Sequence, residues 1–298
     1  MDYQTINIVY HYTSLEVLLK MFDNIKDKKF FFHGSYIQYM NDPTEFMFGL
    51  KKIMELLPQI ENDLLVEDKD RLSQVWKDDD IRVLHIQKLR ETFRLPFVVC
   101  FSNNKDYLPQ WVMYGDKGRG VSLGFDIQDY YRVITYKGKR IIDMTNISDG
   151  KLRAIRVSYK RISIGHFFKN CVSLFYREYL KKIKDNESGL SKEELKISTL
   201  STIAYYLSSI IKHKAYSYEA ESRILYSITN SNDIKFKTNR QGLPIPYMEI
   251  GIETNRLKKI IVGPCCDFES TKMLLQTRLR QLGLEKVKII QSKIPYRA

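Results

Sequence analysis

The chain has 298 residues, of which 44% are hydrophobic, and its net charge is +13 at pH 7. This length and composition predict a folded protein with a sizeable core and exclude a disordered or low-complexity chain. The N-terminus has no basic segment followed by an apolar run, and no stretch approaches the roughly 20 apolar residues that span a bilayer. We therefore expect a cytoplasmic protein that does not contact a membrane.

The four cysteines and the positive charge bear on cofactors and partners. Cys100 and Cys171 are isolated and Cys265 adjoins Cys266, so neither a disulfide framework nor the paired spacing of a zinc site is present in the sequence. We expect reduced thiols and no structural metal. The basic charge favours contact with polyanions such as nucleic acids, although this attraction is unspecific.

The first predicted elements lie in the stretch VYHYTSLEVLLKMF, residues 9–22. Its aromatic and β-branched start favours a strand, and Thr13 or Ser14 can then cap a helix whose apolar residues recur with helical spacing. His11 would lie where the strand ends and the helix begins. Such a position suits a ligand, because helix-terminal amides and an imidazole can converge there. An ordinary strand-to-helix turn explains the same pattern.

The next elements alternate between extended and helical patterns. A short strand is predicted within KKFFFHGSYIQYM, and Asp42 can cap a helix that Pro43 starts. The residues from Glu45 to Leu95 are mostly helical in pattern. The continuous apolar run LPFVVCFS predicts a buried strand, and the segment from Leu108 continues through a glycine-rich turn into another.

Later strands come in clusters. They are predicted in YRVITY, IRVSYK, YEAESRILYSI, YMEIGI, LKKIIVGP and VKIIQSKI. Helices are expected from Gly165 to His213 and from Thr271 to Leu282. Clustered strands with two helical insertions predict an α+β architecture rather than a doubly wound parallel sheet. We expect one domain over residues 1–298, with residues 165–213 as a subdomain or lid.

The glycine-rich stretch YGDKGRGVSLGFD resembles a phosphate-binding loop only superficially. A strand is expected after it, whereas the dinucleotide-binding and nucleoside-triphosphate motifs both lead into a helix that receives the phosphate. A hairpin or bulge is the better prediction, because glycine adopts positive φ at little cost.

The stretch YEAESRILY carries the strongest candidate site. In a strand, Glu219, Glu221 and Arg223 would share one face, because side chains alternate with period two. A solvent-facing salt bridge is one explanation and contributes little stability. In a buried cleft, one carboxylate paired to Arg223 would stay ionised, and repulsion between like charges would raise the pKa of the other.

Several motifs together resemble a known family. YHYTS, MNDPTE, VVCFS, WVMYGD with GRGVSLGFD, YEAESR, IIVGP and SKIPYR are similar to the domain of unknown function family 2971, and they follow that family's order. The resemblance extends over nearly the entire chain. Membership of this family would imply little about activity.

A more distant resemblance concerns the chemistry. A strand ending in His followed by Thr or Ser, a tyrosine in the middle of the chain and a late Glu are similar to the ADP-ribosyltransferase superfamily of the His-Tyr-Glu type. This resemblance implies a split β-sheet core that binds NAD. The implied NAD-binding residues are His11, Tyr12, Thr13 and Arg223, with Tyr36 or Tyr114 stacking on nicotinamide. Glu221 would stabilise the oxocarbenium-like transition state, and Glu219 would orient the acceptor or substitute for Glu221.

The sequence thus predicts an NAD-dependent ADP-ribosyltransferase or NAD glycohydrolase that modifies a nucleic acid or a protein, with a role as a toxin or anti-phage effector. One alternative is a non-catalytic nucleotide-binding or nucleic-acid-binding module lined by His11, Trp111, Tyr114 and Arg223. Another is a metal-dependent nuclease. Its acids would be Asp42, Glu45, Glu219 and Glu221, although their spacing matches no metal motif.

Overall fold

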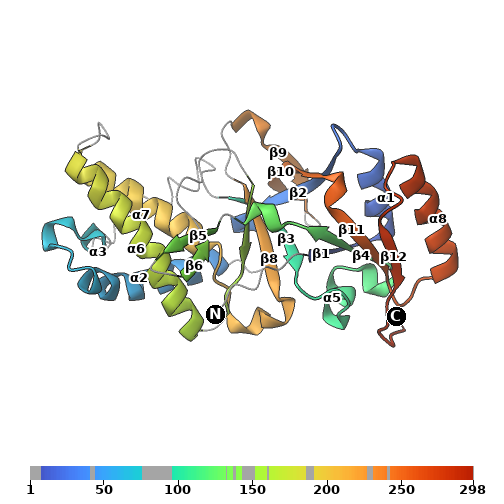
Figure 1. Cartoon of the computed structure of the whole chain (residues 1–298), viewed down its shortest axis with the longest axis horizontal. Coiled ribbons are helices and arrows are strands. Elements are labelled where there is room, and N and C mark those ends of the chain that lie inside the picture. Colours follow the sequence, from blue (N-terminus) through green and yellow to red (C-terminus); the bar gives the residue numbers. More distant parts are fainter. Residues whose placement is uncertain are drawn as a thin grey trace.

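The computed structural model is shown in Figure 1. It describes residues 8–40, 44–75, 96–131, 133–136, 139–142, 152–159, 161–185, 191–226, 231–239 and 242–297. A large, mostly antiparallel sheet lies between helices at its two ends, which agrees with the α+β class expected from the clustered strands. Among the described residues, no helix is both long and apolar enough to cross a bilayer.

The strands of the large sheet are β1 (Ile8–Thr13), β2 (Lys29–Tyr36), β3 (Phe97–Ser102), β4 (Val121–Asp126), β7 (Arg153–Arg156), β8 (Glu221–Tyr226), β9 (Lys235–Thr238), β10 (Pro244–Glu253), β11 (Leu257–Val262) and β12 (Lys288–Gln291). Their main order is β12-β11-β4-β1-β3-β2-β10-β9, with β8 also paired to β3 and β7 paired to β8. Only β11 and β12 pair in parallel among these described strands. A separate hairpin joins β5 (Val133–Tyr136) to β6 (Lys139–Ile142).

The helices are α1 (Leu15–Asp23), α2 (Glu45–Asp63), α3 (Leu72–Val75), α5 (Leu108–Met113), α6 (Arg161–Asp185), α7 (Lys192–Ser208) and α8 (Phe268–Gln281). Figure 1 shows α2, α3, α6 and α7 gathered at one end of the molecule, and we call these four helices the helical unit. It contains the helices expected between residues 165 and 213, while the rest of the helical prediction after Glu45, residues 76–95, lies outside the described residues. The chain between α7 and β8 leads from the helical unit back into the sheet.

The predicted junction between the first strand and the first helix is confirmed. β1 ends at Thr13, and the Ser14 hydroxyl caps α1 by accepting a hydrogen bond from the Val17 amide at 3.2 Å. α1 buries Leu18 and Phe22 in the main core on one face of the sheet. Burial of this apolar stripe holds the helix against the sheet, because a helix of nine residues is marginal by itself.

The sheet forks at β3. One edge of β3 pairs with β8 along its whole length, from Phe97 to Ser102. On the other edge, β1 pairs only at Ser102, and β2 pairs only with Val98 and Phe97. β1 and β2 therefore diverge beside the middle of β3 and leave its central residues without a strand partner on that side. This divergence opens the sheet at its centre.

The prediction of a continuous strand from Tyr218 is wrong at its start. Lys214–Glu219 form a 3₁₀ helix, η5, and Ala220 has a positive φ of 44°, so β8 begins only at Glu221. Tyrosines and glutamates alternate there with period two, which predicts a strand. The backbone instead forms a turn, in which the Ala220 amide donates to the Ser217 carbonyl at 3.3 Å. Glu219 consequently precedes the strand.

The segment before β4 holds a helix that the sequence pattern did not predict. α5 begins at Leu108 with Pro109 in its first turn, where a missing amide hydrogen costs no helical bond. The glycine-rich turn then leads into β4, as expected. Gly118 has a positive φ of 81°, and a Cβ at Gly120 would lie 2.1 Å from the Thr13 carbonyl oxygen. These glycines therefore serve backbone conformation and close packing.

Candidate functional site

A pocket of about 820 Å³ lies at the fork of the sheet. Its walls come from β1, β2, the middle of β3 and α1, and one end is formed by α5, η5 and the start of β8. We call this pocket the fork cleft. The residues expected in a site from the sequence that line it are His11, Tyr12, Tyr114, Glu219 and Glu221. Thr13, Tyr36 and Arg223 are not among its lining residues.

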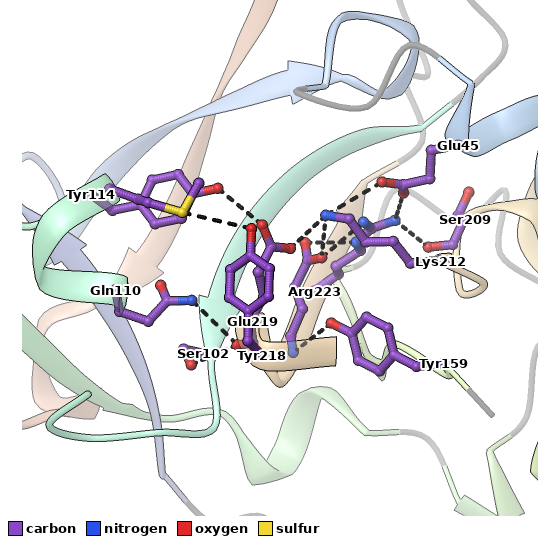
Figure 2. Close-up of polar contacts among 12 residues, drawn as sticks. Glu45, Ser102, Gln110, Tyr114, Tyr159, Ser209, Lys212, Tyr218, Glu219 and Arg223 are labelled. Atoms are coloured by element: carbon purple, nitrogen blue, oxygen red, sulfur yellow. Dashed lines mark hydrogen bonds and ion pairs between the residues drawn. The ribbon is translucent and has the colours of Figure 1, made fainter. Parts of the chain in front are cut away.

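Five buried charges meet at the end of the fork cleft (Figure 2). Lys212 Nζ lies 2.6 Å from Glu219 Oε2, 3.2 Å from Glu221 Oε2 and 3.5 Å from Glu45 Oε2. Arg223 donates from Nε to Glu221 Oε1 at 2.8 Å and from Nη2 to Glu221 Oε2 at 3.0 Å. Its Nη1 lies 2.5 Å from Glu45 Oε1. We call these five residues the charge cluster.

Three carboxylates in the charge cluster share two cations, so its formal charge is −1 when every group is ionised. Burial by itself would raise the pKa of Glu221, but Arg223 and Lys212 outweigh burial and lower that pKa to about 2. Burial would lower the pKa of Lys212, but Glu221 and the other carboxylates raise it well above its ordinary value. Both groups are therefore charged at neutral pH.

Backbone contacts hold the charge cluster in place. The Glu221 amide donates to the Tyr159 hydroxyl at 3.0 Å, and Arg223 Nη1 donates to the Ser209 carbonyl at 2.6 Å. The Ser102 hydroxyl donates to the Glu219 carbonyl at 2.7 Å and ties η5 to the end of β3. The carboxylates are thus positioned by strands and the adjoining segments, which suits a site that must not reorganise during a reaction.

Tyr114 joins the charge cluster to the wall of the fork cleft. It follows α5, and its hydroxyl donates to Glu219 Oε1 at 3.1 Å, as Figure 2 shows. Each carboxylate oxygen of Glu219 therefore has a donor, Tyr114 for one and Lys212 for the other. Tyr114 is half-buried and lines the fork cleft, so its ring is in reach of a ligand there.

His11 lies at the fork itself. Its Nδ1 is 3.1 Å from the Cys100 carbonyl oxygen, in the part of β3 that has no strand partner on this side. A carbonyl oxygen only accepts, so Nδ1 carries the hydrogen. Burial lowers the pKa of His11, against the opposing effect of the Cys100 carbonyl, so the imidazole is neutral at pH 7. Its Nε2 can then accept a hydrogen bond from a ligand in the fork cleft.

The other expected site residues have structural contacts. The Tyr12 hydroxyl donates to the Asn104 carbonyl at 2.8 Å, and its ring lies edge-on to Trp111, with ring centroids 4.9 Å apart. Tyr36 is 1% exposed and packs against Phe97 in the core. Thr13 is 7% exposed. Of the two tyrosines considered for stacking on nicotinamide, Tyr114 is therefore the one on the wall of the fork cleft.

Two members of the charge cluster were absent from the NAD-site prediction. Glu45 entered only as an acid of the nuclease alternative, and Lys212 was not considered. Lys212 directly follows two apolar residues, Ile210 and Ile211, which is a sequence signal for a buried lysine. An unpaired lysine is costly to bury, so this signal also indicates carboxylate partners. The contact of Glu45, at the start of α2, with Arg223 follows only from tertiary packing.

The structure gives the nuclease alternative no ligand set. Among the residues that the structure describes, no three His, Cys, Asp or Glu side chains are grouped to hold a metal ion. Lys212 and Arg223 contact the carboxylates of Glu45 and Glu221, so these acids face cations. Asp42, the fourth acid of that hypothesis, lies outside the described residues.

Comparisons with known proteins give one match. No curated protein and no solved structure matches the chain. A family model does match residues 110–224, a range that includes Tyr114 and the whole segment from Lys212 to Arg223. The N-terminal YHYTS and C-terminal SKIPYR motifs lie outside the matched range. Over residues 110–224, the chain is therefore similar to the family described as a protein of unknown function (DUF2971).

Proposed function

We propose that the chain binds NAD in the fork cleft and cleaves the bond between nicotinamide and ribose, as an ADP-ribosyltransferase or an NAD glycohydrolase. The observation that carries this proposal is the charge cluster, in which three carboxylates share two cations at the end of a cleft. Its negative excess suits a ligand whose reacting end is cationic. The nicotinamide ring of NAD carries such a charge, and the charge passes to the ribose as the bond breaks.

The residues have separate roles in this proposal. Glu221, held ionised by Arg223 and Lys212, faces the ribose and stabilises its developing positive charge. Its partners fix it in place, so it needs no reorganisation during the reaction. Tyr114 packs against the nicotinamide ring, and His11 Nε2 accepts a hydrogen bond from a ribose hydroxyl or the carboxamide. The fit rests on the side chains that line the fork cleft, which include His11, Tyr114, Lys212, Glu219 and Glu221.

The bond changes balance without a further reagent. The carbon–nitrogen bond to nicotinamide breaks, and its electron pair leaves with the neutral nicotinamide. The ribose carbon then bonds to a nucleophilic atom of the acceptor or to water. Glu219, which lies beside Glu221 through their shared partner Lys212, takes the proton that the nucleophile loses. The proposed acceptor is a nucleic acid or a protein, and the proposed role is that of a toxin or anti-phage effector. The net charge of +13 favours a nucleic acid.

A non-catalytic nucleotide-binding module is the second candidate function. Its support is that Arg223 donates to both carboxylate oxygens of Glu221. The charge cluster is therefore also explained as a structural salt-bridge network. Such a module would bind a nucleotide in the fork cleft through His11 and Tyr114 and convert nothing.

Release of nicotinamide from NAD by the purified full-length chain separates these two functions. We expect release by the wild type, stimulated by the correct acceptor when DNA, RNA or cell lysate is added. Glu221→Gln should lower the rate by about 100-fold or more while NAD still binds. Glu269→Gln, which changes an exposed glutamate of α8 that does not line the cleft, is the control and should retain the rate. NAD binding without release would favour the binding module, and neither binding nor release would contradict both.

A further inference from the structure

An exposed aromatic surface adjoins the fork cleft on the side of β2. His33 on β2 and Tyr247 on β10 have ring centroids 4.4 Å apart, and Lys237 Nζ lies 5.4 Å from the centroid of the Tyr247 ring. His33 and Lys237 are exposed, and Tyr247 is half-buried. We call these three residues the β10 platform.

The register of the strands places the β10 platform on one face of the sheet. Tyr247 pairs with Ser35 of β2 and with Lys235 of β9. His33 and Lys237 each lie two residues from those partners, so their side chains emerge on the face of Tyr247. This is also the face on which His33 and Ser35 line the fork cleft. The platform is therefore continuous with the wall of the proposed site.

The charges of the β10 platform are not balanced locally. Lys235 pairs with Glu249 at 2.7 Å, but no described carboxylate lies within salt-bridge distance of Lys237. Burial lowers the pKa of Lys237, and burial together with Lys237 and Lys235 lowers that of His33, against the effect of Glu249. The Lys237 ammonium, near the Tyr247 ring and without a described carboxylate partner, is therefore open to an anionic ligand.

We propose that the β10 platform binds a nucleotide, with the base stacked on His33 and Tyr247 and the phosphate paired with Lys237. Stacking on aromatic side chains is tolerant of base identity, and the lysine ammonium supplies the charge that a phosphate needs. Two ligands of the proposed reaction contain such a nucleotide. One is a dinucleotide, in its adenosine half, and the other is a single-stranded nucleic acid acceptor. The assignment to one of these two ligands rests on the proposed function, but nucleotide binding to the β10 platform does not depend on NAD turnover.

The test is binding of AMP, NAD and a short single-stranded oligo(dA) to the full-length chain, measured by calorimetry. Tyr247→Leu and Lys237→Gln should each weaken AMP binding about tenfold or more. Phe236→Leu is the matched control, because Phe236 is an exposed aromatic on the opposite face of β9, and it should leave binding unchanged. Thermal unfolding of each variant checks that the fold is retained.

The pattern of losses identifies the source of the nucleotide. Weaker binding of NAD with unchanged oligo(dA) assigns the platform to the adenosine of the dinucleotide, and the reverse assigns it to the acceptor. Glu221→Gln should leave AMP binding intact, so a failure of NAD turnover does not remove this result. The proposal is overturned if the wild type binds none of the three probes, or if the platform variants bind them as tightly as the Phe236→Leu control.

Discussion

Two buried carboxylate sites in this chain differ in the donors that satisfy them. In the helical unit, Glu61 of α2 accepts from the Tyr176 hydroxyl, from the Ser73 amide at 2.8 Å and from the Ser73 hydroxyl. All of these donors are neutral. In the charge cluster, Glu221 is instead held by Arg223 and Lys212. Burial is nearly complete at both sites, with Glu61 0% and Glu221 4% exposed.

The comparison shows that burial of a carboxylate is not by itself a sign of an active site. Glu61 joins α2 to α3 and α6, and it is not among the residues that line the fork cleft. The charge cluster has acidic and basic groups in unequal number, and two of its carboxylates line the cleft. Unequal numbers of acidic and basic groups and access to a cleft are therefore what distinguish the charge cluster, the proposed functional site, from the Glu61 site.

Removing a cation should affect stability most. Arg223→Met leaves Glu45 and Glu221 buried with only Lys212 between them, and we expect the free energy of unfolding to fall by about 3–5 kcal/mol. Guanidinium titration measures this loss. The control Arg256→Met breaks more exposed ion pairs with Glu253 and Asp129 and should cost no more than about 1 kcal/mol. Equal losses in the two variants would contradict a special role for the charge cluster.

Acid should weaken the charge cluster next. The folded pKa of Glu221 is about 2 and its ordinary value is 4.5, so its stabilising effect is complete above pH 4.5 and is lost as the pH falls toward 2. Over this range the unfolded chain binds about one more proton at this residue than the folded chain. Unfolding measured from pH 5 to pH 2 should therefore lose stability more steeply in the wild type than in Glu221→Gln. Parallel curves would argue against a lowered pKa.

The fold was predictable where local sequence decides the structure. β1 and α1 follow from a strand-forming run, a serine cap and helical apolar spacing, all within one short stretch. β3 follows in the same way from an uninterrupted apolar run. The turn at Ala220 was not predictable, because a non-glycine residue with positive φ leaves no signal in an alternating pattern. The convergence of Glu219 with Glu221 nevertheless occurs, through Lys212 rather than through a shared strand face.

The fork of the sheet and the contribution of Glu45 from α2 to the site could not be predicted without the tertiary structure. Nothing in the sequence of β3 indicates that β1 and β2 pair with opposite ends of the same edge. Glu45 reaches Arg223 only because α2 packs against the end of α7, where Gly49 lies so close to Ser208 that a Cβ would be 2.6 Å from the Ser208 Cα. Long-range packing of this kind has no local periodicity from which to predict it.

Removing a neutral donor should have a smaller effect on stability and none on the site. Tyr176→Phe deletes one hydrogen bond to Glu61 and the acceptor of the Leu72 amide, which lies 2.9 Å from the Tyr176 hydroxyl. We expect the free energy of unfolding to fall by about 1–3 kcal/mol, because buried polar groups lose partners without a loss of paired charge. AMP and NAD binding should be unchanged. Weaker nucleotide binding would show that the Glu61 site is coupled to the charge cluster, contrary to the distinction between the two sites.

The smallest expected effect concerns His11, which has a single polar contact that the structure describes, the Cys100 carbonyl. Burial lowers its folded pKa below 6.5, so its contribution to stability is complete above pH 6.5 and is lost as the pH falls. Nuclear magnetic resonance of the ring protons, assigned with His11→Asn, should show a titration midpoint below 6.5, and a ligand that donates to Nε2 should move it lower still. His213 is exposed and is not among the residues that line the fork cleft, so its ring signals are the internal control and should not move when ligand is added. A midpoint for His11 at or above 6.5, or one insensitive to NAD at saturation, would remove the imidazole from the proposed site.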